Sequence, residues 1–449
     1  MRRSPSIASQ VGLSERFFSS ASDRGLAANI DAGIAEIETA LVAELVFPNE
    51  IANVTSRYLV NAGGKRVRPM LALLTAHLGD GVTADVVTAA TAIELTHLAS
   101  LYHDDVMDDA DKRRGVPSAQ TGGGNSIAIL TGDLLFARAS QLMSRLGERA
   151  IRLQAITFER LVMGQFRETV GPAAGEDPVE HYIQVLAGKT GSLIAAAAQA
   201  GVVFADAPER FEQPVVEFGE KIGVAFQLID DVLDLSPQPQ ETGKVPGTDL
   251  RAGVVTLPLL RLRERAVTDA VAADLLARLD RDVINTISPS SDAEHPGTAT
   301  DTAVADAAIA ALRDHPVTAE TLAEAHGWAR DAVAALAPLP DGSVKKALSR
   351  FAESIVERSK CRNCAWLSWG PARPAFMRPT SCSRRNASST SRSTCSTTCP
   401  PRTAWCVTGW PRTTRASRAS SPRCAMCSIV AIFACSATCG SGKTSPWTT

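Results

Sequence analysis

Two absences divide the sequence into parts of very different composition. No cysteine precedes Cys361, so the first part of the chain indicates nothing about its redox compartment. No aspartate or glutamate follows Glu357. All 48 acidic residues and 33 of the 46 basic residues therefore lie in residues 1–358, which carry a net charge of −15, whereas residues 359–449 carry the other 13 basic residues.

Long apolar runs and a secretory signal are also absent. The most apolar stretch, residues 191–205, is rich in small residues and falls short of the roughly 18 apolar residues that a membrane span needs. The opening MRRSPSIASQ has no apolar segment behind its arginines, so no signal peptide is expected. With 45% hydrophobic residues, the sequence predicts a globular protein of the cytoplasm, and peripheral contact with a membrane is left open.

Apolar residues in the first part recur at the helical period. Near its start they occupy positions i, i+4, i+7, i+11 and i+15, at Ile30, Ile34, Ile37, Leu41 and Leu45. The last segment before residue 358 repeats this pattern, and no segment alternates for long at the strand period. Residues 236–247 and 287–298 are richest in Pro, Gly and Ser and are predicted loops. The first part is therefore predicted to be all-α.

Residues 359–449 follow a different pattern. Ser, Thr, Arg, Cys, Pro and Trp dominate, and such a stretch cannot bury enough apolar surface to offset its ordering entropy. We predict a disordered tail that arises from a shifted reading frame near residue 358. The expected domains are an N-terminal extension (1–27), a catalytic domain (28–358) and this tail.

Three other interpretations of the tail stay open. A zinc site fits the spacing of its last cysteines, Cys424, Cys427, Cys435 and Cys439. The stretch GSGKTS resembles the end of a P-loop, although Ala437 stands where the first glycine belongs. The basic charge could also attract nucleic acid or a membrane surface.

One acidic motif, D-D-x-x-D, occurs twice in helical contexts. Its aspartates are Asp104, Asp105 and Asp108 in LYHDDVMDD, and Asp230, Asp231 and Asp234 in FQLIDDVLDL. The first and last aspartates of each motif share a helix face, where like charges repel. Carboxylates are the hard oxygen ligands that Mg²⁺ prefers beside phosphate oxygens. A single motif would be read as a solvated acidic helix face, but the pair predicts a metal and diphosphate site.

Basic residues are spaced around these motifs. They are Lys65 and Arg68 in GGKRVRP, Arg113 and Arg114 after the first motif, Lys189 beside Thr190 in AGKTGS, and Lys244 in GKVPGTDL. Cations placed next to aspartates suggest polyanions bridged by metal. Two diphosphates, one held by Mg²⁺ and one held directly by Lys and Arg, would use all of them.

These segments, in this order and over about residues 28–358, resemble the trans-polyprenyl diphosphate synthases, above all the bacterial long-chain enzymes that make menaquinone side chains. The resemblance implies an isoprenoid synthase-like helical bundle around a deep central cavity, usually in a homodimer. It implies head-to-tail condensation of isopentenyl diphosphate with an allylic diphosphate, with Mg²⁺ as cofactor and no nucleic acid partner. The product would partition into membranes although the enzyme has no membrane span.

The resemblance also assigns roles to single residues. The six motif aspartates would bind Mg²⁺. The allylic diphosphate would contact Arg113, Lys189 and Lys244, with Thr190 and Gln227 lining the site. The diphosphate of isopentenyl diphosphate would be held by Lys65, Arg68, His97 and Arg114. By itself, His97 would be read as a satisfied core histidine. Val254 stands where many members carry a lysine, which implies weaker closure around the diphosphate.

Small residues before the first motif bear on product length. Ala99 lies about 7.5 Å of helix rise below Asp104, and Ser100 lies beside it. In the family, large aromatic residues here stop chain growth, so small ones imply a product beyond four isoprene units. Alternatively, they merely allow close helix packing.

Two other functions fit the sequence less well. A class I terpene cyclase would leave the Lys65 and Arg68 site idle, and a non-catalytic subunit of a heteromeric synthase would be expected to have lost aspartates.

Overall fold

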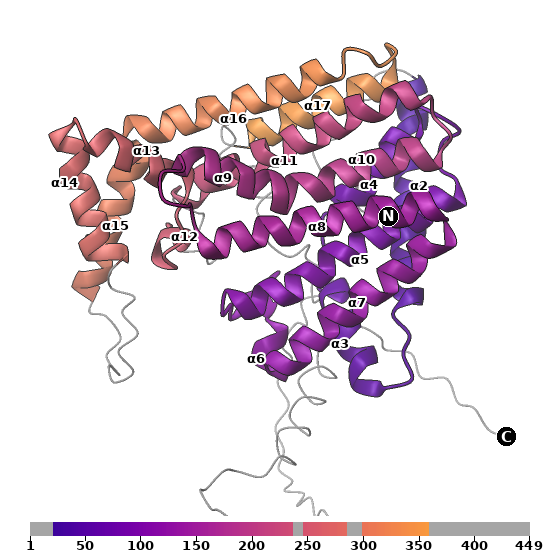
Figure 1. Cartoon of the computed structure of the whole chain (residues 1–449), viewed down its shortest axis with the longest axis horizontal. Coiled ribbons are helices and arrows are strands. Elements are labelled where there is room, and N and C mark those ends of the chain that lie inside the picture. Colours follow the sequence, from indigo (N-terminus) through magenta and orange to yellow (C-terminus); the bar gives the residue numbers. More distant parts are fainter. Residues whose placement is uncertain (1–20, 237–245, 285–298, 359–449) are drawn as a thin grey trace, which may run out of the picture. The chain divides into compact units, whose positions relative to one another are not determined.

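The computed structural model describes residues 21–236, 246–284 and 299–358. These residues are almost entirely helical (Figure 1), so the predicted all-α class is confirmed. Within them the one strand pair is the short hairpin of β1 (Lys112–Arg113) and β2 (Val116–Pro117). The predicted loop at 287–298, most of that at 236–247, and the whole tail lie outside the described residues, so the zinc, P-loop and frame-shift interpretations stay predictions.

The first half of the chain forms helices α2 to α8. They are α2 (Ala21–Glu44), α3 (Glu50–Asn61), α4 (Val67–Ala76), α5 (Ala84–Met107), α6 (Ala119–Gly123), α7 (Asn125–Arg145) and α8 (Glu148–Val170). The apolar stripe on α2 is buried, with Ile30, Ile34, Ile37, Leu41 and Leu45 each at most 1% exposed. This burial is what the i, i+4 spacing predicts.

The second half continues with helices around the same core. They are α9 (Pro178–Leu186), the π-turn η2 (Ala187–Gly191), α10 (Ser192–Phe204), the short η3 (Glu209–Phe211), α11 (Glu212–Asp234), α12 (Thr248–Arg251), α13 (Leu257–Ala266), α14 (Ala270–Leu279), η4 (Asp280–Ile284), α15 (Ala299–Asp314), α16 (Pro316–Ala335) and α17 (Ser343–Glu357). Figure 1 shows α16 and α17 beside α11, in agreement with their contacts.

Helix α5 is the centre of the main hydrophobic core. It is buried around most of its circumference from Val86 to Tyr102, and its buried residues include the polar Glu94 and His97. It packs against α7, α10, α4 and α2. A smaller apolar cluster joins α12 to α15, with Leu250, Leu275 and Ile309 at its centre. None of the described helices is long and apolar enough to cross a membrane.

Candidate active site

One cavity of about 2280 Å³ is walled by α5, α8, α9, η2, α11 and α13. Its polar part carries aspartates from both motifs, and its apolar part carries side chains such as Leu101, Phe136 and Leu193. A smaller pocket beside it is lined by residues 62–68 together with Glu94, His97, Arg114 and Phe226. Arg68 and His97 line both, so the two spaces adjoin.

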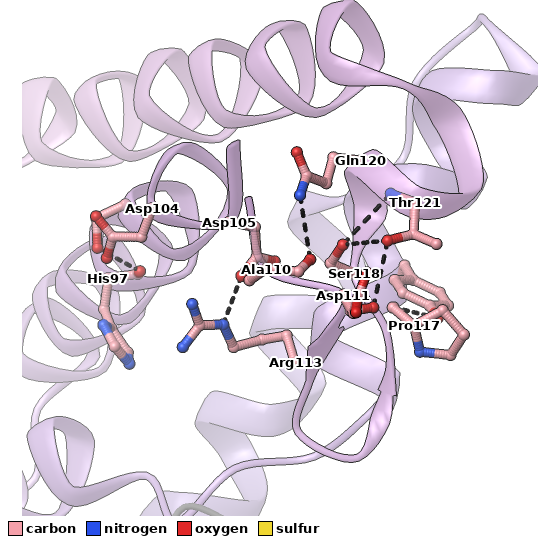
Figure 2. Close-up of polar contacts among 12 residues, drawn as sticks. His97, Asp104, Asp105, Ala110, Asp111, Arg113, Pro117, Ser118, Gln120 and Thr121 are labelled. Atoms are coloured by element: carbon pink, nitrogen blue, oxygen red, sulfur yellow. Dashed lines mark hydrogen bonds and ion pairs between the residues drawn. The ribbon is translucent and has the colours of Figure 1, made fainter. Parts of the chain in front are cut away.

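The first acidic motif turns two aspartates to the cavity and one away from it. Asp104 and Asp108 line the cavity, whereas Asp105 has a side chain that is 0% exposed and accepts a 2.6 Å hydrogen bond from Nε of Arg113 (Figure 2). Asp105 therefore positions Arg113 and is not one of the described residues that line the cavity. Burial raises the pKa of Asp104 to about 6, opposed by Lys189 and increased by Asp108.

A tight hairpin brings Arg113 back to Asp105. Arg113 pairs with Val116 across β1 and β2, and the two residues between them, Arg114 and Gly115, have φ of 52° and 76°. Positive φ at both central residues defines a type I′ turn, which suits the twist of a two-residue hairpin. The turn therefore places Arg113, which lines the cavity, beside the first motif.

The second motif, at the end of α11, places all its aspartates on the cavity wall. Asp231 is buried and accepts a 2.9 Å hydrogen bond from the hydroxyl of Tyr182, and burial raises its pKa to about 8. Asp234 accepts a 3.1 Å bond from the backbone N–H of Asp249. Asp230 pairs with Arg358 at 2.7 Å.

These carboxylates suit a divalent cation that arrives with its substrate. No three His, Cys, Asp or Glu side chains of the described residues are grouped closely enough to hold a metal by themselves. Mg²⁺ commonly takes only one or two carboxylates and completes its shell with water and phosphate oxygens.

The π-turn η2 carries Lys189 and Thr190 into the cavity. Nζ of Lys189 lies 2.6 Å from Oε2 of Glu168 and 4.0 Å from Oδ1 of Asp104. A Cβ on Gly164 would lie 2.6 Å from the backbone nitrogen of Lys189, so α8 and η2 approach closely there. Extra-wide turns of this type are frequent at functional sites. Gln227 lines the cavity too, whereas Lys244 lies outside the described residues.

The small pocket gathers the cations predicted for a second diphosphate. Arg68 is buried and its Nε has no hydrogen-bond partner, and burial lowers its pKa to about 10. Burial, with Arg68 and Arg114, lowers the pKa of His97 well below its usual range, so His97 is neutral. Arg114 donates from Nη1 to the carbonyls of Leu59, at 2.8 Å, and Gly63. Lys65 completes the lining.

Arg66, between the two predicted cations, has a different role. It has φ of 50°, and its guanidinium bonds Glu38 at 2.6 Å and Glu94 at 2.9 Å with 1% of its side chain exposed. Burial acts to lower the pKa of Arg66, but Glu94 and Glu38 outweigh it and raise the pKa. This buried pair ties the 62–66 segment to α2 and α5.

Replacing Arg66 with methionine should destabilise the fold by about 3 kcal/mol, because the buried carboxylate of Glu94 would lose the guanidinium that bonds it at 2.9 Å. Urea unfolding, monitored by circular dichroism, measures the change in the free energy of unfolding. The control is Glu38→Gln, which should cost less, since the Glu38 side chain is 36% exposed. An equally small loss of unfolding free energy in both variants would contradict the proposal that Arg66 holds the 62–66 segment to α2 and α5.

The two small residues before the first motif, Ala99 and Ser100, differ in their access to the cavity. Ser100 lines the cavity, whereas Ala99 is fully buried and is not among the described lining residues. A Cβ on Gly132 would lie 3.2 Å from the carbonyl oxygen of Ala99, so α5 and α7 pack closely at that level. The rings of Phe136 and Phe158, which also line the cavity, have centroids 4.6 Å apart.

Several site residues were not predicted from the sequence. They are Arg66, Glu168, Tyr182 and Arg358. Glu168 and Tyr182 belong to no acidic or basic cluster in the sequence, and Arg358 lies 128 positions from Asp230, so sequence spacing gave no signal for them. Val254, where a lysine was expected, is on the cavity wall and 44% exposed.

Comparisons with known proteins agree on one family. The family model described as polyprenyl synthetase matches residues 49–285. The chain is 39% identical over 359 residues to nonaprenyl diphosphate synthase of Mycobacterium tuberculosis. The aligned region covers 80% of this chain and 99% of that protein. About a fifth of this chain therefore has no counterpart in that relative.

Solved structures give the same result. A decaprenyl diphosphate synthase from Rhodobacter capsulatus matches with a TM-score of 0.64 and 29% identity, over 75% of this chain and 99% of that chain. A geranylgeranyl pyrophosphate synthase from Corynebacterium glutamicum, complexed with calcium and isoprenyl diphosphate, matches with a TM-score of 0.63 and 37% identity, over 76% of this chain and 99% of that chain.

Proposed function

Because the chain belongs to the polyprenyl synthetase family and is a prenyltransferase, we propose that it elongates prenyl chains. It would add isopentenyl diphosphate repeatedly to an allylic diphosphate and give a long all-trans polyprenyl diphosphate. The observation that carries the proposal is a cavity and an adjoining pocket that form two chemically different anion sites. Aspartates suited to a cation line one, and buried arginines line the other, Arg68 among them.

The cofactor proposed is Mg²⁺, held by Asp104 and Asp108 on one side and by Asp230 and Asp234 on the other. Magnesium, when bound, would supply positive charge that stabilises the departing diphosphate. All four carboxylates line the cavity, which supports the assignment. Asp105 and Asp231 then act mainly through the groups that they hold, Arg113 and Tyr182.

The chain's own residues bind and orient both substrates. Arg113 and Lys189 lie where they would neutralise charge on the allylic diphosphate as its C–O bond breaks, with Lys244 proposed as a third cation. In the other site Lys65, Arg68 and Arg114 would hold isopentenyl diphosphate, with neutral His97 beside it. With both substrates held in this way, the isopentenyl double bond would attack the allylic carbocation and form the new C–C bond. The resulting cation would then lose a proton to the departed diphosphate, which restores a double bond. Apolar walls exclude water that would quench the cation.

The test is to incubate the full chain with radiolabelled isopentenyl diphosphate and an allylic starter. The expected product, after dephosphorylation, is a prenyl alcohol lengthened by several isoprene units. A cyclised hydrocarbon would indicate a class I terpene cyclase, and no product would indicate a non-catalytic subunit. The six motif aspartates and the buried Arg68 pocket favour elongation over both.

The use of the product is also part of the proposal. A long polyprenyl chain suits the side chain of menaquinone or another quinone, and its hydrocarbon would partition into a membrane. We place the enzyme in the cytoplasm, with peripheral contact at most when product leaves.

We also propose a homodimer formed across α7 and α8. Large apolar side chains are exposed on these two helices: Ile129 (43%), Leu130 (62%), Ile151 (50%), Ile156 (51%) and Met163 (49%). Large apolar side chains gathered on exposed helices are typical of protein interfaces. Light scattering should give the mass of a dimer, and Leu130→Glu should yield monomer. A native chain that is monomeric at micromolar concentration would contradict the proposal.

The proposed catalytic domain is residues 28–358. Its last helix, α17, buries Leu348, Phe351 and Ile355 against the core. A chain ending after Arg358 should therefore keep native activity and unfolding temperature. Loss of folding in this shortened chain, or one equivalent of zinc in the full chain, would mean that residues 359–449 form a functional segment.

A further inference from the structure

Arg358 follows helix α17, and its side chain is 1% exposed. Its Nη2 donates a 2.7 Å hydrogen bond to Oδ1 of Asp230, and its guanidinium lies 4.7 Å from the ring centroid of Phe226. The helix before it is anchored in the core through Phe351 and Ile355. A packed element therefore holds this cation against the second acidic motif.

The position of Arg358 is between the two anion sites. It lines the large cavity, and Phe226, which it covers, lines the small cationic pocket. Its partner Asp230 keeps 26% of its side chain exposed, so the carboxylate also faces open space in the cavity. One carboxylate is thus within reach of both a protein cation and a cation from solution.

We propose that Arg358 is a positioning residue that occupies Asp230 until metal and diphosphate arrive together, which makes metal binding at the second motif depend on diphosphate. The inference rests on the proposed function, because it takes Asp230 as a metal ligand. A guanidinium and a divalent cation compete for the same carboxylate oxygen, so a metal ion alone must displace the ion pair.

The cost of that displacement differs with and without diphosphate. A guanidinium this deeply buried is strongly destabilised when its anion is taken, since little water reaches it. Stacking on Phe226 retains part of its stabilisation. When diphosphate accompanies the metal, its oxygens offer Arg358 a replacement anion. Metal alone should therefore bind weakly at this motif, and metal with diphosphate should bind well.

The test measures Mn²⁺ binding by electron paramagnetic resonance, with Mn²⁺ alone and with added inorganic diphosphate. In the full chain, Arg358→Gln should bind Mn²⁺ alone about tenfold more tightly, and the gain from diphosphate should shrink by a similar factor. Arg358→Lys keeps the charge and should stay near the native affinity. The control Lys346→Gln removes a charge from the same helix at an exposed site and should change nothing.

Two further variants keep the test decisive. In an Asp230→Asn background, Arg358→Gln should no longer change Mn²⁺ affinity, because the shared carboxylate is gone. If Arg358→Gln does not fold by circular dichroism, Phe226→Leu removes the stacking that partly stabilises a displaced guanidinium, and it should weaken the binding of Mn²⁺ alone. Unchanged or weaker binding of Mn²⁺ alone in folded Arg358→Gln, or unchanged or tighter binding in Phe226→Leu, would overturn the proposal. Because no turnover is measured, this failure is distinct from a failure to elongate prenyl chains.

Discussion

Replacing Asp104 with asparagine should lower turnover about a thousandfold at saturating substrate, while the helical circular dichroism signal persists. The amide keeps the volume of the side chain but removes the negative charge that would hold the cation beside the departing diphosphate. Because burial already raises the pKa of Asp104 to about 6, neutralising it should not harm the fold. Steady-state kinetics over a range of Mg²⁺ concentrations measures the loss.

The matched control is Asp109→Asn, one residue beyond the motif. Asp109 is exposed and accepts a 3.3 Å hydrogen bond from Gln120, and it is not among the described residues that line the cavity. Its variant should keep activity within about twofold of the native chain. Near-native turnover of Asp104→Asn at limiting Mg²⁺ would remove Asp104 from the proposed metal site.

Replacing Ser100 with phenylalanine should abolish long products and leave the first condensations intact. Ser100 lies one helical turn below Asp104 on the cavity wall, so a ring there would fill the space into which the growing chain extends. The carboxylates of the metal site are untouched. Chromatography of dephosphorylated products should show chains of only a few isoprene units.

Ala99→Phe separates this effect from general damage to α5. Ala99 is fully buried where α5 and α7 pack closely, so a ring there should destabilise the fold by about 1–3 kcal/mol instead of blocking the cavity. An unchanged product distribution in a folded, active Ser100→Phe variant would mean that the chain grows along another wall. If Ala99→Phe shortened the products and Ser100→Phe did not, the growing chain would also have to follow another wall of the cavity.

Local periodicity predicted the fold well. The stripe from Ile30 to Leu45 is buried because residues at helical spacing must share a face, and the family resemblance was confirmed by the matches to known synthases. The same geometry also explains two distinctions that the motif alone hides. Asp104 and Ser100 are four residues apart, so they share the helix face that lines the cavity. Asp105 lies about 100° around the helix from Asp104, and Ala99 lies about 100° in the other direction from Ser100.

Contacts between distant segments were beyond sequence reasoning. Arg66 and Lys65 are both basic neighbours in the sequence, yet Arg66 has a positive φ and a buried guanidinium that pairs with Glu94. Arg358 meets Asp230 because α17 packs beside α11, a tertiary arrangement that no local pattern encodes. Ion pairs between distant segments depend on which helices become neighbours, and helical periodicity in the sequence does not determine the choice of neighbours.

The cavity and its adjoining pocket should hold two diphosphates by different means, one through metal and one directly through cations. Equilibrium binding of isopentenyl diphosphate and of an allylic thiolodiphosphate, which does not ionise, should be measured with and without a chelator. Chelation should abolish binding of the allylic analogue and leave isopentenyl diphosphate binding within about threefold, and Arg68→Gln should weaken only the binding of isopentenyl diphosphate. Loss of both ligands on chelation, or of neither, would contradict this difference between the two sites.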